Sequence, residues 1–171
     1  MTYSKNQVRV LDGIRPDQIP FDKLFDANEP IILRGLVSDW DLVKAGKVSP
    51  KNAMDILQRQ SSGKSARVFI APHETHARFF YKEDLSGFNF QSKHAPLSEI
   101  FGLIREGKNN SEHPYYYMNS LTLDECFPGL RENNDLVFDH ENFISNQPLS
   151  KVWVGTESVA AAHYDVPNNL A

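Results

Sequence analysis

A histidine and an aspartate separated by one residue, His163 and Asp165, are the side chains of this 171-residue chain best suited to chemistry. Residues 159–165 predict a β-strand, in which side chains two apart project to the same face. An imidazole and a carboxylate on one face can occupy two positions around one metal ion, while Tyr164 points to the other face. The spacing therefore predicts part of a metal site.

The chemistry of such a pair depends on a third ligand. A second histidine from another strand would complete the two-histidine, one-carboxylate arrangement of non-haem Fe(II) sites, which leaves metal positions open for a co-substrate and oxygen. The surroundings favour this interpretation, because the alanines at 160–162 leave room beside a metal and Pro167 can bend the strand away. The alternative is a histidine that simply hydrogen-bonds a nearby carboxylate, as an isolated His-x-Asp pair often does.

Other polar clusters predict less chemistry. His73 and His76 lack the helical spacing of zinc-protease histidines and would point to opposite sides of a strand, so we expect a solvated turn. Residues 139–141 similarly predict a polar loop. Ser158 lacks the glycine elbow of a hydrolase nucleophile, and Cys126 is expected to be a half-buried apolar residue.

The composition predicts one globular domain. Hydrophobic residues make up 40% of the chain, and the formal net charge of -4 excludes a basic excess that would hold a nucleic-acid backbone or an anionic membrane. The single cysteine rules out an intramolecular disulfide. The N-terminal residues do not resemble a signal peptide, and no apolar stretch reaches the roughly 20 residues of a membrane span. We therefore expect a cytoplasmic protein with no membrane partner.

Capping residues and periodicity predict two long helices. One should begin at Pro50 with Ser49 as its N-cap, and it should cover the core without being part of a site. The other should run over residues 96–106, bury apolar side chains at helical spacing and close at Gly107.

Several strands are expected, most of them late in the chain. They cover residues 30–36, 67–70, 77–81, 115–118, 151–155 and 159–165, with a short helix at 21–25 and a short helix or turn at 123–130. The first strand should be buried, and the strands at 67–70 and 77–81 should pair around the turn between them. The predicted architecture is α+β or mainly β, with helices packed outside an antiparallel sheet or barrel.

The late motif gives the chain its resemblance to a known family. Residues 152–155 (VWVG) followed by 161–169 (AAHYDVPNN) resemble the motif region of jumonji-related cupin-like oxygenases, a group that includes the asparaginyl hydroxylase that inhibits hypoxia-inducible factor. Residues 30–36 followed by Trp40, and residues 115–120, are similar to earlier strands of the family. The resemblance implies a double-stranded β-helix, the cupin or jelly-roll fold, with N-terminal helices and strands packed outside.

The resemblance also implies that the complete protein is an Fe(II)- and 2-oxoglutarate-dependent oxygenase, a hydroxylase, with His163 and Asp165 as iron ligands. Many relatives place a threonine or serine three residues before the metal histidine, where this chain has Ala160, so another hydroxyl must anchor the co-substrate. The family's second metal histidine and its basic co-substrate anchor lie on later strands. We therefore expect a chain that lacks the C-terminal half of the barrel and is inactive alone.

Further site residues follow from the resemblance. Tyr117 matches the tyrosine that in relatives hydrogen-bonds the far carboxylate of 2-oxoglutarate, although Tyr115 has the same strand parity and is the alternative. Asn169 matches an asparagine that lines the co-substrate pocket in some relatives. Asn119 matches a polar residue near the substrate channel. As alternatives, the tyrosine is a core aromatic and the asparagines are turn-forming amides.

The organisation and partners complete these expectations. We expect residues 1–171 to form one incomplete domain, with an N-terminal extension at 1–29 and the helical cover and first barrel strands at 30–171; the apolar finish of the sequence agrees with a partial chain. Relatives act on protein side chains, small molecules and modified tRNA bases, and the protein is a candidate homodimer. The alternative class is a non-catalytic cupin-like binding or interaction module, which a stop codon directly after Ala171 would favour.

Overall fold

The computed structural model divides the chain into two compact units. The first unit comprises Met1–Ile56 and Gly129–Leu149, and the second comprises Leu57–Pro128 and Ser150–Ala171. The residues that the structure describes are 7–27, 29–107, 112–145, 147–161, 163 and 169.

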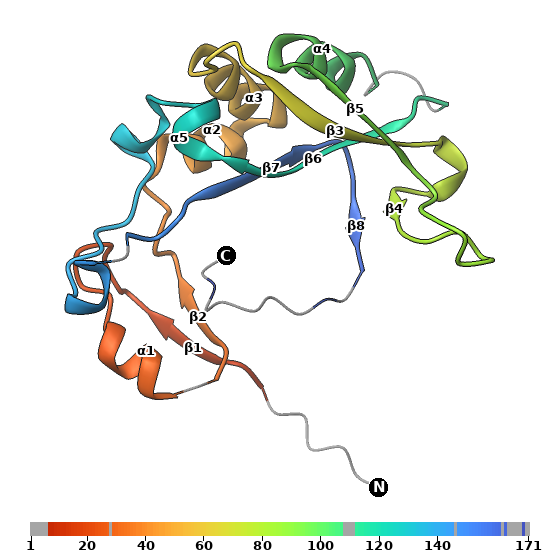
Figure 1. Cartoon of the computed structure of the whole chain (residues 1–171). Coiled ribbons are helices and arrows are strands. Elements are labelled where there is room, and N and C mark those ends of the chain that lie inside the picture. Colours follow the sequence, from red (N-terminus) through yellow and green to blue (C-terminus); the bar gives the residue numbers. More distant parts are fainter. Residues whose placement is uncertain are drawn as a thin grey trace, which may run out of the picture. The chain divides into compact units, whose positions relative to one another are not determined.

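A β-α-β arrangement opens the first unit. Strand β1 (Arg9–Asp12) pairs in parallel with β2 (Ile31–Arg34), and α1 (Phe21–Ala27) lies between them in the chain (Figure 1). The predicted helix and the predicted strand are confirmed, whereas β1 and the parallel pairing were not expected. The expected burial of β2 is wrong, because alternate residues are exposed and Ile32 keeps 49% of its surface. This strand is covered on one face only.

A buried asparagine completes the start of α2 (Asp41–Val48), which has no capping side chain at its own N-cap position. Oδ1 of Asn134 accepts a hydrogen bond from the backbone N–H of Leu42 at 2.8 Å, and its Nδ2 donates to the carbonyl oxygen of Leu130 at 2.8 Å. Asn134 is buried, so these bonds satisfy an amide that would otherwise be costly to remove from water.

Aromatic rings cluster around the buried Phe21 in the first unit. Phe21 lies with its ring centroid 5.0–6.2 Å from four other rings, those of Phe25, Phe138, His140 and Phe143. Nε2 of His140 lies 2.9 Å from Oδ1 of Asp22, and the His140 side chain is only 14% exposed. The prediction of a polar loop at residues 139–141 is therefore only partly correct, because its histidine packs among phenyl rings.

The second unit is built on a four-stranded antiparallel sheet with the strand order β5-β3-β6-β7. Its strands are β3 (Ser65–Ala71), β5 (Gln91–Pro96), β6 (Tyr115–Thr122) and β7 (Lys151–Gly155). Three of them lie where strands were predicted. Strand β5 was missed because it is almost entirely polar and exposed, as suits a strand at the edge of a sheet.

The pairing predicted between residues 67–70 and 77–81 is wrong. Both edges of β3 are already occupied, one by β5 and the other by β6. Strand β4 (Arg78–Phe79) instead pairs in parallel with β8 (Val159–Ala160), which is distant in the sequence. Local sequence could not reveal this long-range pair.

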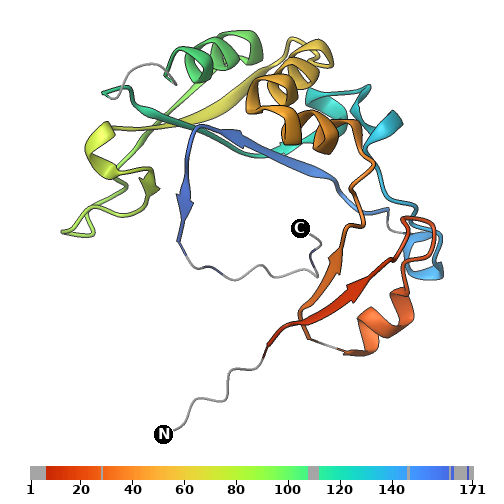
Figure 2. The same cartoon turned by 180° about the vertical axis from the view of Figure 1, so that it is seen from behind.

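Helix α4 (Leu97–Gly107) covers one face of the sheet and confirms the predicted helix. The four apolar residues chosen by helical spacing are all buried, namely Leu97, Ile100, Phe101 and Ile104. Figures 1 and 2 both show α4 on one side of the sheet and β8 leading away on the other. The short α5 (Leu123–Cys126) follows β6 directly, so the helix or turn predicted there is also present.

Helix α3 (Pro50–Arg59) begins as predicted, with proline in its first turn. Oγ of Ser49 accepts a hydrogen bond from the backbone N–H of Asn52 at 3.1 Å, which is the expected N-cap bond. Leu57 is its buried residue.

Together these elements make a chain of mixed α and β content with an antiparallel sheet. The closed jelly-roll barrel and the single domain stay predictions. Within the described part of the chain, no helix has the length and apolar character needed to cross a membrane.

Candidate functional site

Strand alternation gives the four-stranded sheet two unlike faces. Val68 and Met118 are fully buried on the face that α4 contacts. The neighbouring residues in each strand project to the other side, which we call the open face and define by Arg67, Phe69, His94, Tyr115, Tyr117 and Asn119. Cross-strand register places Phe69 opposite Tyr117 and Arg67 opposite His94. Both β6 residues predicted to touch a ligand, Tyr117 and Asn119, lie on this face.

Tyr117 has the environment expected of a hydrogen-bond donor to a ligand. Its ring is half-buried and lies 5.4 Å from that of Phe79, centroid to centroid. Burial raises the pKa of its hydroxyl above the usual value of a tyrosine, so the group stays protonated at neutral pH. Within the described residues the hydroxyl has no hydrogen-bond partner, and a carboxylate could accept a hydrogen bond from it.

A glycine on the adjacent strand fixes the position of Tyr117. Gly155 is the Cα partner of Tyr117 in the β6-β7 register. A Cβ added to Gly155 would lie 2.5 Å from the carbonyl oxygen of Tyr116 and 3.2 Å from Cα of Tyr117. The two strands approach so closely here that only glycine fits, and the backbone of Tyr117 is held accordingly.

Tyr115 lies on the same face, two residues earlier in β6. Its ring stacks on His73 with a centroid distance of 5.8 Å and an interplanar angle of 13°. Both tyrosines therefore stay candidates for binding the co-substrate, with Tyr117 beside the phenyl ring of Phe79 and Tyr115 beside the imidazole of His73.

An aromatic cluster adjoins Tyr117 through Phe79 and was not predicted from the sequence. Phe90 lies with its centroid 5.0 Å from Phe69, 5.6 Å from Phe79 and 4.8 Å from Phe88. These four rings lie within residues 69–90, whereas Tyr117 comes from a later strand, so local sequence did not reveal that the cluster meets Tyr117. Phe79 belongs to this cluster and also contacts Tyr117, so the tyrosine ring lies beside an apolar surface.

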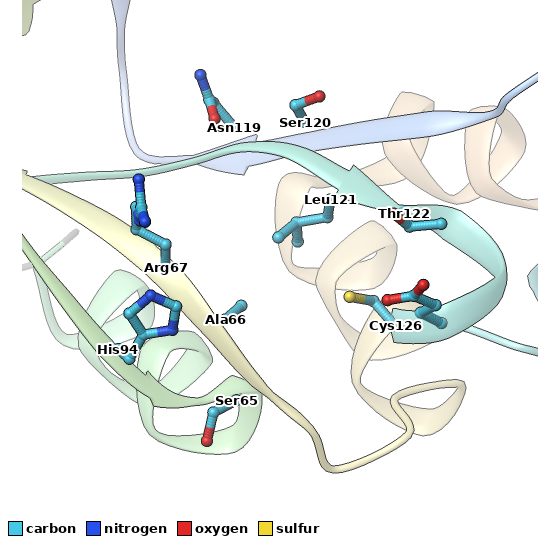
Figure 3. Close-up of a pocket in the computed structure, with 10 residues that line it drawn as sticks. Ser65, Ala66, Arg67, His94, Asn119, Ser120, Leu121, Thr122 and Cys126 are labelled. Carbon is cyan, nitrogen blue, oxygen red and sulfur yellow. The ribbon is translucent and has the colours of Figure 1, made fainter.

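A shallow groove of about 320 Å³ opens beside Asn119, between β3 and β6 (Figure 3). Its walls include Arg67 and His94 on one side and Asn119 and Ser120 on the other, with Glu125 at the α5 end. All of these side chains are exposed. The polar residue predicted near a substrate channel thus lies at a groove.

His163 is exposed and lies beyond the described end of β8. Its Nδ1 is 2.8 Å from the carbonyl oxygen of Ala161. A carbonyl oxygen only accepts hydrogen bonds, so this contact favours a proton on Nδ1 and leaves the lone pair of the neutral ring on Nε2. Metal-binding histidines commonly have this arrangement, and the residue fits the role of a metal ligand.

The remaining motif residues are only partly described. Asp165 lies outside the described residues, so the predicted geometry of the histidine and carboxylate pair stays a prediction. Asn169 is described and exposed. In the part of the chain that the structure describes, no group of three or more histidine, cysteine or acidic side chains could hold a metal ion.

The sequence candidates that we set aside behave as structural residues. His73 begins the turn η1 (His73–Thr75), and His76 follows in the left-handed conformation with φ of 50°. The expected turn is confirmed. Cys126 is more buried than expected, at 8% exposure, and burial raises the pKa of its thiol, which makes it a poor nucleophile at neutral pH.

Comparison with known protein families assigns most of the chain. A family model described as a cupin-like domain matches residues 16–171, which is most of the chain and includes all of the predicted site residues. No curated protein matches the chain.

Proposed function

Because the chain belongs to the cupin-like domain family, which includes 2-oxoglutarate oxygenases, we propose that the protein is an Fe(II)- and 2-oxoglutarate-dependent oxygenase. The observation that carries the proposal is the open face of the sheet, where the half-buried Tyr117 lies beside Phe79 and its hydroxyl has no hydrogen-bond partner among the described residues. A finer likeness to the asparaginyl hydroxylase of this group is part of the same proposal.

His163 and Asp165 would hold the metal. The contact between Nδ1 of His163 and the carbonyl oxygen of Ala161 would favour the tautomer that binds a metal through Nε2. The carboxylate of Asp165 would reduce the net charge of the site, and a second histidine is required as the third protein ligand. When bound, Fe(II) supplies the oxidative chemistry, while the protein supplies geometry and a dry pocket.

Tyr117 would orient 2-oxoglutarate by donating a hydrogen bond from its hydroxyl to the far carboxylate. Ala160 offers no hydroxyl at the place where many relatives have one, so the tyrosine would contribute a larger share of the co-substrate binding energy. Asn169 would line the same pocket, and Asn119 would contact the substrate from the groove.

The substrate would be a protein side chain or a small molecule, and a modified tRNA base belongs to the same set. The net charge of -4 weighs against docking on a nucleic-acid backbone. A cytoplasmic homodimer is the proposed form of the protein.

Metal binding provides the direct test in the full-length protein. We expect His163→Ala and Asp165→Ala each to weaken Fe(II) binding at least tenfold, measured by anaerobic titration, and to abolish 2-oxoglutarate consumption. His76→Ala is the matched control, because it removes an exposed histidine from a turn of the same unit. Undiminished metal binding and turnover in both motif variants would refute the assignment.

A non-catalytic cupin-like binding module is the second candidate. The exposure of His163 favours it. The module would bind a ligand on its open face without consuming 2-oxoglutarate, so the titration and the turnover assay separate the two candidates.

A further inference from the structure

A row of polar side chains crosses the open face one step along the strands from Tyr117. Arg67 is the Cα partner of His94 on β5. Phe69 on β3 is the Cα partner of Tyr117 on β6. Arg67 lies two residues before Phe69, and Asn119 lies two residues after Tyr117. Because the two strands are antiparallel, Arg67 and Asn119 lie on the same side of that pair. Figure 3 shows Arg67 and Asn119 pointing to the same side of the sheet. The three residues form a polar counterpart to the aromatic cluster.

The groove exists because two strands separate at this row. The ladder between β3 and β6 begins at the pair Ala71 and Tyr115 and ends at the pair Phe69 and Tyr117. It does not extend to Arg67. Strand β6 is irregular between Met118 and Leu121, where Ser120 adopts a φ of 53°. The strands therefore diverge, and a ligand can enter between Arg67 and Asn119 without breaking a ladder hydrogen bond.

Arg67 is a cation without a protein partner in the described structure. It forms no ion pair and no side-chain hydrogen bond, in contrast to Arg131, which is 2.7 Å from Asp135, and Lys93, which is 2.8 Å from Glu99. Glu125, the acidic residue of the groove wall, is not within ion-pair distance of it either. The guanidinium keeps its donors available for a planar oxyanion, to which it can bind through two hydrogen bonds.

We propose that Arg67, His94 and Asn119 form a subsite for a carboxylate carried by the substrate. Arg67 would hold both oxygens, while the amide of Asn119 and the ring of His94 would offer further hydrogen bonds. Glu125 at the far end of the groove and the negative net charge disfavour polyanions, so a single carboxylate fits better than a nucleic acid. The binding of a carboxylate here does not depend on the proposed function. Only the statement that this carboxylate belongs to the oxidised substrate rests on it.

The test uses a matched pair of probes on the metal-free full chain. N-acetylglycine carries one carboxylate, and N-acetylglycinamide has the same shape without the charge. We expect N-acetylglycine, observed by amide NMR titration, to shift the signals of Arg67, His94 and Asn119 saturably, and N-acetylglycinamide to leave them unchanged. Arg67→Gln should weaken the binding at least tenfold. Arg67→Lys should weaken it less, because lysine keeps the positive charge but cannot make the two parallel hydrogen bonds of a guanidinium.

Controls make each outcome decisive. Arg59→Gln, which removes an exposed arginine of α3 in the same unit, should leave the titration unchanged. Equal affinity in Arg67→Gln, an equal response to the neutral amide, or tighter binding of inorganic phosphate would overturn the carboxylate subsite. Repeating the titration in His163→Ala separates the two proposals, since the subsite should persist there even if the metal assignment fails.

Discussion

The two faces of the β5-β3-β6-β7 sheet are made by the same strands and differ in almost every other respect. On the covered face, Val68 and Met118 have no exposed surface beneath α4. On the open face, their neighbours Arg67 and Asn119 are exposed and line a groove. Alternation within one strand thus separates the residues that stabilise the unit from those available to a ligand. Substitutions on the two faces should therefore have different consequences.

The largest difference should appear between two adjacent residues of β6. We expect Met118→Ala to lower the free energy of unfolding by about 2–5 kcal/mol, because it leaves a cavity at a fully buried position. Asn119→Ala should change it by no more than about 0.5 kcal/mol, since the side chain is exposed. Urea unfolding monitored by circular dichroism measures both. Equal losses for the two variants would show that the faces are not energetically distinct.

A smaller effect should follow from crowding the two strands beside Tyr117. Gly155→Ala would push a methyl group against the backbone of Tyr116, and we expect a loss of about 1–3 kcal/mol. Gly102→Ala in α4 is the matched control, because a Cβ there meets no atom within 4 Å and should stabilise the helix by about 0.5–1 kcal/mol. Thermal unfolding of the two variants measures both effects. Equal losses of stability would contradict the close approach of β6 and β7.

The smallest effect should distinguish the two tyrosines of the open face. Tyr117→Phe removes only a hydroxyl, and we expect unchanged stability but a KM for 2-oxoglutarate raised about tenfold in the full-length protein. Tyr115→Phe serves as the comparison and should leave KM near that of the wild type. Steady-state kinetics of 2-oxoglutarate consumption gives the answer. The reverse pattern would assign the co-substrate role to Tyr115.

The covered face and its helices follow from local sequence because local rules govern them. The Ser49 cap, the spacing of the apolar residues in α4 and the β-prone run in β6 each reflect interactions within a few residues. Strand β5 could not be predicted in this way, because its polar side chains lack the alternating apolar pattern of a strand. The parallel pair of β4 and β8 joins segments about 80 residues apart, which no periodicity records.

The candidate site was predictable to the same limited extent. Family resemblance directed attention to His163, Tyr117 and Asn119, and strand parity placed the last two on one face. Arg67 and His94 were missed, because their meeting depends on the register of β3 with β5 and on the separation of β3 from β6. Both are properties of the assembled sheet. The metal geometry at Asp165 lies outside the described residues and stays a prediction.

The irregularity in β6 changes the phase of the strand. Before it, the even-numbered Met118 is buried, and after it, the odd-numbered Leu121 is buried. Asn119 and Ser120 can thus both be exposed in succession, which strict alternation forbids. One extra residue therefore lines the groove: deleting Ser120 should restore strict alternation along β6, keep Leu121 facing inward and leave Asn119 as the last outward residue before it beside Arg67.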